Sequence, residues 1–219
     1  MTTPVLGSAT PWQPTDVGGV IALLGDSPVR WWVSGGVALD RWLGREIRTR
    51  PNTDVSVIAS DLPALVDGLP AGFTVWAPAE AEGYVVPFDE APGDSDRQPV
   101  LVRDESREMW VLQVNVEDGT RDAWVYKRDP RLTLPWERAV VDLDGVPIGA
   151  PQLQLVWKAL RPRPEDDLDK DAVLAVLDDD ARGWYERAIL SIHPHSTWSI
   201  HVRSPFAPAK ASWNRTSRR

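Results

Sequence analysis

Hydrophobic residues follow two different periods along the chain, and the change between them falls near residue 150. Before that point, apolar residues occur in short runs or alternate with polar ones, which is typical of β-strands. After it, they recur at intervals of three and four residues, which is typical of helices with one buried face. The sequence therefore predicts an α+β fold, in which a mixed β-sheet with flanking helices is followed by a helical C-terminal part.

The first part of the chain is expected to contain several strands and short helices. Strands are predicted at residues 29–34, 54–59, 73–77, 98–103, 108–117 and 122–128, with a hairpin edge inside residues 78–99. Thr15 is expected to cap a helix that ends near Leu24, and further helices are predicted at residues 37–43 and 61–69. In the longest strand, Trp110 and Leu112 are predicted on one face, and three polar residues on the other: Gln113, Asn115 and Glu117.

Four segments follow from these patterns. They are a loose N-terminal arm at residues 1–16, an α/β domain at 17–150, a helical subdomain at 151–202 and a basic tail at 203–219. The acidic run at residues 165–180 is interpreted as the solvated face and first turns of the C-terminal helices, where carboxylates complement the helix dipole. Tryptophans on predicted apolar faces are interpreted as core: Trp32, Trp110, Trp157 and Trp184.

Composition and charge exclude several classes of protein. The 219 residues include no cysteine, which excludes disulfides, thiolate nucleophiles and thiolate metal sites. The net charge of -8 argues against binding to a nucleic acid backbone and favours cationic partners. No apolar run approaches the roughly 20 residues of a membrane span, and the first residues do not resemble a secretory signal, so we expect a cytoplasmic protein.

A double glycine separates a predicted buried strand from a predicted helix. Residues 29–34 read VRWWVS, Gly35 and Gly36 follow, and the helical pattern then ends at Gly44. Such a turn can present backbone N–H groups at a helix N-terminus to a phosphate. The same pattern also occurs in tight turns that only pack a helix onto a sheet.

The next predicted strand carries oxygen donors on one face. Val55 and Val57 alternate with Asp54 and Ser56, and Asn52 extends the polar face if the strand begins early. Side chains at i and i+2 point to the same side of a strand. This spacing suits a hard cation such as Mg²⁺ beside a triphosphate, so Asn52 and Asp54 are candidate metal ligands.

Together, these residues resemble the signature block of the polymerase-beta-like nucleotidyltransferase superfamily, in its aminoglycoside and lincosamide nucleotidyltransferase branch. The block comprises Ser34-Gly35-Gly36, Ala38-Leu39-Asp40, Leu43-Gly44-Arg45, Arg48 and Thr53-Asp54-Val55. Supporting similarities follow at Trp124-Val125, Arg128-Asp129-Pro130-Arg131, Gly145-Val146-Pro147, Gln154-Leu155, Lys158-Ala159, Arg163-Pro164, Asp166-Asp167 and Asp169. The resemblance covers residues 31–198.

The resemblance implies a nucleotide-binding transferase. Such enzymes transfer a nucleoside monophosphate from ATP or another nucleoside triphosphate, with Mg²⁺, to a hydroxyl of a small acceptor, here aminoglycoside-like and cationic. The implied nucleotide-binding residues are Ser34, Gly35, Gly36, Arg48 and Lys158. The implied metal ligands are Asp54 and Asn52, and the implied catalytic carboxylates are Asp54 and Glu117.

The chain departs from the pattern of this family at several positions. Asn52 stands where the family has the first of two aspartates, and Arg50 stands where it has a histidine. Two further departures are Gln152 in place of glutamate and Glu165 in place of lysine. An amide oxygen can bind Mg²⁺ but brings no charge. The third carboxylate of the family has no certain match, and Glu117 or a group near Asn115 could take its place.

Two functions therefore stay open from the sequence. One is an active, adenylyltransferase-like nucleotidyltransferase. The other is a catalytically weakened or inactive relative, a pseudoenzyme that acts as a nucleotide-binding or protein-interaction module. The sequence leaves the oligomeric state open as well.

Overall fold

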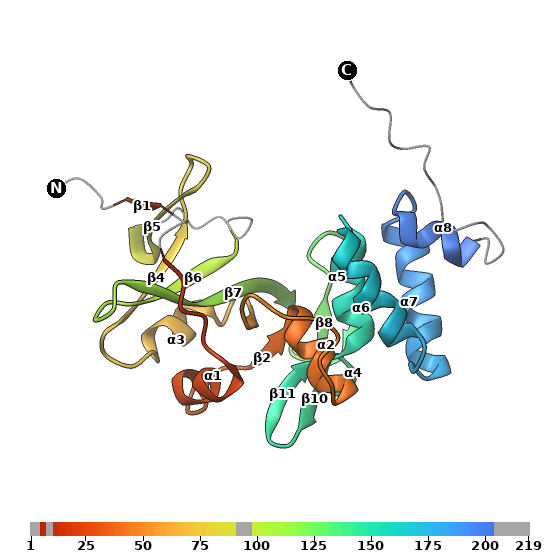
Figure 1. Cartoon of the computed structure of the whole chain (residues 1–219), viewed down its shortest axis with the longest axis horizontal. Helices are drawn as coiled ribbons and strands as arrows, with labels where there is room; N and C mark the ends of the chain where they lie inside the picture. Colours follow the sequence, from red (N-terminus) through yellow and green to blue (C-terminus); the bar gives the residue numbers. More distant parts are fainter. Residues whose placement is uncertain (1–4, 8–10, 91–97, 204–219) are drawn as a thin grey trace. The chain divides into compact units, whose positions relative to one another are not determined.

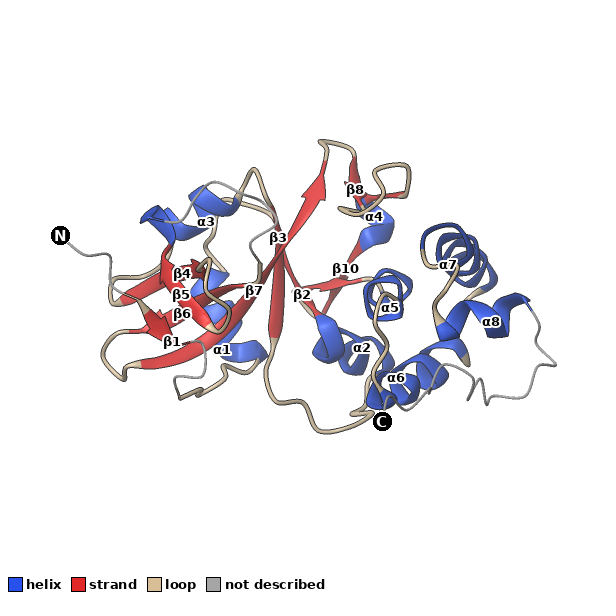
Figure 2. Ribbon diagram, turned by 90° about the horizontal axis from the view of Figure 1, so that it is seen from above, coloured by secondary structure: helices blue, strands red, loops and turns tan. Residues whose placement is uncertain are grey.

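The computed structural model describes residues 5–7, 11–90 and 98–203, and the chain divides into two compact units. The first unit ends at Ala150 and the second begins at Pro151. In the described residues, strands occur in the first unit alone, whereas the second unit is built from helices (Figure 1 and Figure 2). This is the predicted α+β fold, with a mixed sheet, flanking helices and a helical C-terminal part.

A mixed sheet forms the centre of the first unit. Its strands are β1 (Leu6–Gly7), β2 (Trp31–Ser34), β3 (Asp54–Ile58), β4 (Phe73–Pro78), β5 (Tyr84–Pro87), β6 (Val100–Asp104), β7 (Met109–Gly119), β8 (Ala123–Val125), β9 (Thr133–Pro135), β10 (Val140–Leu143) and β11 (Val146–Gly149). The order is β1-β5-β4-β6-β7-β3-β2-β11-β10, and β8 pairs with β7 and β9. β3 runs parallel to β7 and antiparallel to β2, so segments far apart in the sequence share one face of the sheet.

Short helices flank this sheet. They are α1 (Val17–Leu24), α2 (Gly35–Leu43), α3 (Leu62–Asp67), the 3-10 helix Phe88–Glu90 and α4 (Trp136–Ala139). The side chain of Asp16, rather than the predicted Thr15, caps α1, because its carboxylate accepts a hydrogen bond of 2.8 Å from the Gly19 N–H. Asp is among the preferred residues at this position because its short side chain reaches the uncapped N–H groups.

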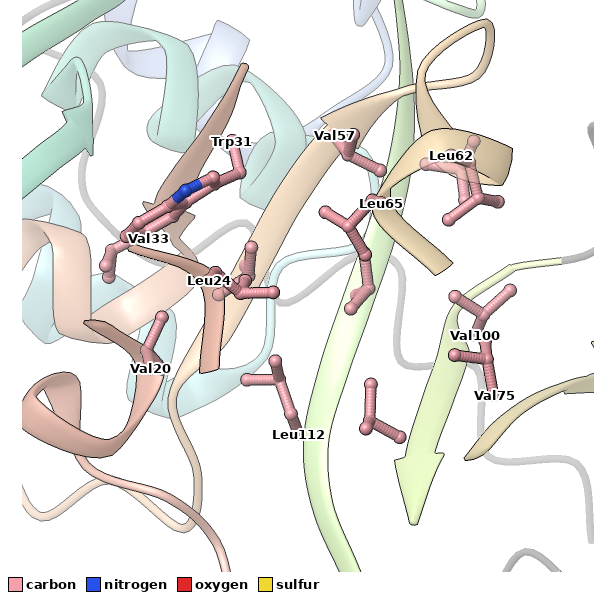
Figure 3. Packing of buried hydrophobic residues seen from close by; sticks show 14 of the residues in the cluster. Val20, Leu24, Trp31, Val33, Val57, Leu62, Leu65, Val75, Val100 and Leu112 are labelled. Atoms are coloured by element: carbon pink, nitrogen blue, oxygen red, sulfur yellow. The ribbon is translucent and has the colours of Figure 1, made fainter. Parts of the chain in front are cut away.

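Apolar side chains from α1, α3 and one face of the sheet form the main core. Figure 3 shows Leu24 of α1, Leu65 of α3 and Leu112 of β7 in this cluster. The strand residues of the cluster include Val33, Val55, Val57, Val114 and Val116. Because successive residues of a strand point to opposite faces, the alternate positions of β2, β3 and β7 face the other side of the sheet.

Trp110 lies on a different face from the one predicted. The register between β6 and β7 shifts after Val102, so that Val102 pairs with Leu112 but Arg103 pairs with Trp110. The extra residue of this β-bulge reverses the alternation. Trp110 is therefore fully buried in a second cluster with Trp76 and not beside Leu112.

The N-terminal segment is not a loose arm where the structure describes it. β1 pairs with β5, and the backbone N–H groups of Gln13 and Thr15 donate hydrogen bonds of 2.9 Å to the carbonyl groups of Trp110 and Val111. Residues 1–4 and 8–10 lie outside the described residues. The described part of this segment is therefore tied to the sheet by backbone hydrogen bonds.

The second unit consists of helices packed on one another. They are α5 (Pro151–Ala159), α6 (Pro164–Leu174), α7 (Asp179–Ile192) and α8 (Thr197–Arg203). α5 packs against α6 and α7, and α7 packs against α8. Trp157 and Trp184 are partly buried, whereas Trp32 in the first unit is fully buried. The predicted basic tail lies outside the described residues beyond Arg203, and no described helix is both long and apolar enough to cross a membrane.

Candidate functional site

The glycine turn joins β2 directly to α2. All four residues of β2 are buried, and the helix begins at Gly35 without an intervening loop. Gly35 has φ +64°, in the left-handed region that favours glycine, and a Cβ atom there would overlap the carboxylate of Asp54. The hydroxyl of Ser34 does not cap the helix. The turn therefore brings the positive end of the α2 dipole next to Asp54.

A polar row crosses three strands on the face of the sheet opposite the valine core. Ser34 on β2 pairs with Asp54 on β3, and Asp54 pairs with Gln113 on β7. Two residues further along β3 and β7, Ser56 pairs with Asn115. The Asn115 amide donates a hydrogen bond of 3.4 Å to the Ser34 hydroxyl and accepts one of 3.4 Å from the Gln113 amide. The strand register thus gathers side chains with oxygen donors around Asp54.

Asn52 and Asp54 are in contact at the start of β3. The Asn52 amide donates a hydrogen bond to one carboxylate oxygen of Asp54. To bind a cation together with Asp54, this amide must rotate and present its oxygen in place of its nitrogen. The predicted pair of ligands is therefore brought together, in an arrangement that a hydrogen bond from the amide to the carboxylate stabilises.

The donor set fits a magnesium ion that is delivered with phosphate groups. Mg²⁺ prefers oxygen ligands and is commonly held by one or two carboxylates plus substrate phosphates. Asp54 and Asn52 supply one carboxylate and one amide oxygen. Within the described residues, no group of three or more aspartate, glutamate or histidine side chains could hold a metal ion. Asp54 and Asn52 are therefore the residues of this site that would hold such an ion.

The segment between α2 and β3 is anchored by an ion pair. The Arg50 guanidinium donates hydrogen bonds of 2.7 and 2.6 Å to the two carboxylate oxygens of Asp40. Both side chains are largely buried, with exposed fractions of 8% and 13%. Arg48, a predicted nucleotide-binding residue, is partly buried in the same segment. Arg50, which stands where the family has a histidine, is thus a structural neighbour of the glycine turn.

Glu117 is not brought to Asp54. It pairs with Ile58, four residues along β3 from Asp54, which corresponds to about 13 Å of strand. Its buried carboxylate accepts a hydrogen bond from the indole N–H of Trp124. The structure therefore does not bring these two predicted catalytic carboxylates together, and the catalytic role of Glu117 stays a prediction.

A nearby tyrosine shows the electrostatic setting of Glu117. Burial raises the pKa of the Tyr126 hydroxyl above its usual value, the charge of Arg128 opposes this shift, and the charge of Glu117 adds to it. Tyr126 also packs against Trp124, with ring centroids 5.9 Å apart. Glu117 therefore belongs to an aromatic environment at the far end of β7, whereas amide side chains occupy β7 beside Asp54.

Lys158 is held by two carboxylates inside the second unit. Its ammonium nitrogen lies 2.6 Å from Asp166 and 3.1 Å from Asp169. Burial alone would raise the pKa of Asp166, but hydrogen bonds from Arg163 and Lys158 outweigh it and hold this pKa below its usual range. Asp166 and Asp169 are buried, so the interpretation of the acidic run as a solvated face is wrong at these two positions. It is confirmed at the exposed residues Asp167, Asp171, Asp178, Asp179 and Asp180. The predicted role of Lys158 at a triphosphate stays a prediction.

Comparisons with known proteins add a likeness of shape. No protein-family model matches the chain, and no curated protein matches it in sequence. One similar solved structure is the crystal structure of ANT(2″)-Ia in complex with adenylyl-2″-tobramycin, with 13% identity, coverage of 78% of this chain and 94% of that chain, and a TM-score of 0.47. Another is the solution structure of the antibiotic-resistance factor ANT(2″)-Ia, with 14% identity, coverage of 82% and 95%, and a TM-score of 0.45. At values this low, neither likeness establishes a family, a substrate or an activity for this chain.

Two features of the site were missed by the sequence analysis. Gln113 lies level with Asp54 because β3 and β7 are parallel neighbours, and no local sequence signal reports this register. Asp40 anchors Arg50, although the two belong to different elements. The position of Asp40, one helical turn after Gly36, was a usable signal because residues at i and i+4 share one face of a helix.

Proposed function

We propose that this protein is a nucleotidyltransferase-like enzyme that binds a nucleoside triphosphate at the turn formed by Gly35 and Gly36. It transfers the nucleoside monophosphate group to a hydroxyl of a small cationic molecule, such as an aminoglycoside-like acceptor. The observation that carries this proposal is the packing of a left-handed glycine, at the first residue of α2, directly against the carboxylate of Asp54. Phosphate groups and a metal-binding carboxylate need this proximity.

The residues have complementary tasks in this reaction. The first turn of α2 attracts the phosphates through its N–H groups and dipole. Asp54 and the rotated amide of Asn52 would hold Mg²⁺, which, when bound, withdraws charge from the α-phosphate. The acceptor hydroxyl loses its proton to solvent, its oxygen forms a bond to the α-phosphorus, and the bond from the α-phosphorus to the oxygen bridging the β-phosphate breaks, so pyrophosphate leaves. The catalytic role predicted for Glu117 stays a prediction.

The acceptor class rests on charge. The chain carries 32 acidic and 24 basic residues, and the resulting net charge of -8 attracts cations. A polyamine-like acceptor with several hydroxyls satisfies both the charge and the chemistry. The nucleotide is ATP or another nucleoside triphosphate, and the reaction in the first case is an adenylyl transfer.

A second candidate function is nucleotide binding without turnover. The observation that favours it is the replacement of charge by amides: Asp54 is flanked by Asn52 in its own segment and by Gln113 on β7. With a single carboxylate, the site binds Mg²⁺ weakly before the nucleotide arrives. Such a protein would act as a nucleotide-binding or protein-interaction module.

A thermal-shift titration separates the two functions. ATP, GTP, CTP and UTP are each added with Mg²⁺, with EDTA and alone. For the enzyme, we expect one triphosphate with Mg²⁺ to raise the melting temperature by about 5–10 °C at about a hundred times its Kd, because the ligand binds the folded state. An equal shift with EDTA supports nucleotide binding without turnover, and no shift with any triphosphate contradicts nucleotide binding, with or without turnover. A positive result is followed by measuring pyrophosphate release with a panel of aminoglycoside-like acceptors.

Asn52→Asp is expected to increase the affinity for Mg²⁺ in the presence of triphosphate by about tenfold, because it adds a charged ligand beside Asp54. Without divalent metal, the same change should lower the melting temperature, because a hydrogen bond is replaced by repulsion between two carboxylates. Isothermal titration calorimetry and thermal unfolding measure the two effects.

Thr49→Asp is the matched control for Asn52→Asp, because it adds the same charge to an exposed position of the same segment. It should change neither quantity appreciably. If Asn52→Asp raises neither metal affinity nor pyrophosphate release, Asp54 does not form a metal site with position 52.

A further inference from the structure

The guanidinium of Arg50 lies against the first turn of α2. A Cβ atom on Gly36 would approach its Nη1, Cζ and Nε atoms to 2.5, 2.7 and 2.9 Å. These distances are shorter than van der Waals contact, so any side chain at position 36 displaces the guanidinium. Unlike Gly35, Gly36 does not have a positive φ. The presence of Arg50, rather than the backbone conformation, therefore requires glycine at position 36.

Asp40 fixes the guanidinium in this place. It lies one turn after Gly36, on the same face of α2, and binds Arg50 through both carboxylate oxygens. The same carboxylate accepts a hydrogen bond of 3.0 Å from the backbone N–H of Ile47, and the Asp40 carbonyl accepts one of 3.1 Å from the N–H of Arg45. Asp40 thus ties the segment that leads into β3 to the helix at several points.

We propose that Arg50 and Asp40 are positioning residues, which hold the glycine turn in register with Asn52 and Asp54. This inference rests on the proposed function, because it gives the pair a purpose at the same site. Gly35 packs against the carboxylate of Asp54, and Gly36 packs against the guanidinium of Arg50. The two consecutive glycines are therefore close both to the candidate metal ligand and to the residue that anchors the segment leading into β3. The planar, two-point geometry of the arginine is essential, because lysine offers a single point charge.

The first test measures the coupling between positions 36 and 50. Gly36→Ala is expected to lower the melting temperature by about 2–8 °C in the wild-type background, since the methyl group displaces a buried ion pair. In an Arg50→Ser background, the same Gly36→Ala change is expected to leave the melting temperature unchanged or to raise it, because alanine favours the helix and the obstacle is gone. An equal fall in both backgrounds overturns the inference.

The second test measures binding at the site. The Kd of the triphosphate identified by thermal shift is measured for Arg50→Ser and Arg50→Lys, well below their melting temperatures. Both variants are expected to bind at least about tenfold more weakly, because small misplacements at a binding site have large effects. Arg50→Lys retains the charge, so it is informative even where Arg50→Ser folds poorly. Arg41→Ser removes an equal charge from an exposed position of α2 and should retain the wild-type Kd.

The two tests separate the inference from the function on which it rests. If the wild-type protein binds no triphosphate, the proposed function fails, and the sign reversal of Gly36→Ala alone decides whether Arg50 holds the turn. If the wild-type protein binds triphosphate and both Arg50 variants bind it equally well, the positioning role is wrong and the proposed function stands.

Discussion

Asp54→Asn is expected to lower nucleotide transfer by about a thousandfold and to remove the dependence of triphosphate binding on Mg²⁺. Asp54 alone carries a charge among the described polar side chains that strand pairing and hydrogen bonds place beside the turn, which are Ser34, Asn52, Asp54, Gln113 and Asn115. The fold should survive, because an asparagine at this position still accepts the hydrogen bond from Asn52. Pyrophosphate release measures the transfer, and calorimetry with and without Mg²⁺ measures the binding.

Asp67→Asn is the control for Asp54→Asn, since it removes the same charge from an exposed position of α3. It should leave transfer, binding and melting temperature near the wild-type values. An Asp54→Asn variant that binds the triphosphate with an unchanged requirement for Mg²⁺ would show that the metal site lies elsewhere. A wild-type protein that binds the triphosphate but never releases pyrophosphate would instead favour the binding module.

The main features of the sheet were predictable because its strands keep a regular two-residue period. Val55 and Val57 face the core as predicted, and Asp54 and Ser56 face the opposite side. A strand's own sequence determines which residues share a face, because neighbouring side chains point in opposite directions. The sequence of a strand contains no information about which other strand lies beside that strand. The pairing of Asp54 with Gln113, and the resulting distance of Glu117, could therefore be learned only from the structure.

Irregular features were also beyond the sequence analysis. The β-bulge after Val102 moves Trp110 to another cluster, and a single inserted residue leaves no clear mark in the hydrophobic pattern. The strands β9, β10 and β11 were not predicted, since they are short and their stability depends on their neighbours in the sheet. The contact of Arg50 with Gly36 likewise depends on how one loop folds back on α2.

Helical spacing in the C-terminal part predicted which apolar residues are buried, but it did not predict which charged residues are buried. Leu153 and Val156 are buried on α5 as their spacing predicts. The acidic run looked like a solvated surface, because carboxylates are seldom buried without a partner. The structure shows that Lys158 is that partner for Asp166 and Asp169. Burial of charged residues depends on pairs between helices, which a single helical pattern does not reveal.

Lys158→Met is expected to destabilise the protein by about 3–5 kcal/mol, because it leaves the buried carboxylates without their shared cation. The exposed fractions of Lys158, Asp166 and Asp169 are 12%, 3% and 0%. Asp166 keeps its hydrogen bonds from Arg163 in this variant, so the loss is that of the ion pairs with Lys158. Urea unfolding followed by circular dichroism measures the change in free energy.

Two comparisons make this prediction specific to the buried cluster. Arg161→Met removes a charge from an exposed position of the same unit and should change the stability by less than about 0.5 kcal/mol. The double variant Lys158→Met with Asp169→Asn should be more stable than Lys158→Met alone, because it removes one of the two buried negative charges that Lys158 neutralises. The lowered pKa of Asp166 adds a pH dependence: its contribution is complete above the ordinary aspartate pKa of about 3.9 and is lost as the pH falls below it. A wild-type protein whose stability does not fall below that pH, together with a Lys158→Met variant as stable as Arg161→Met, would show that these ion pairs do not stabilise the helical unit.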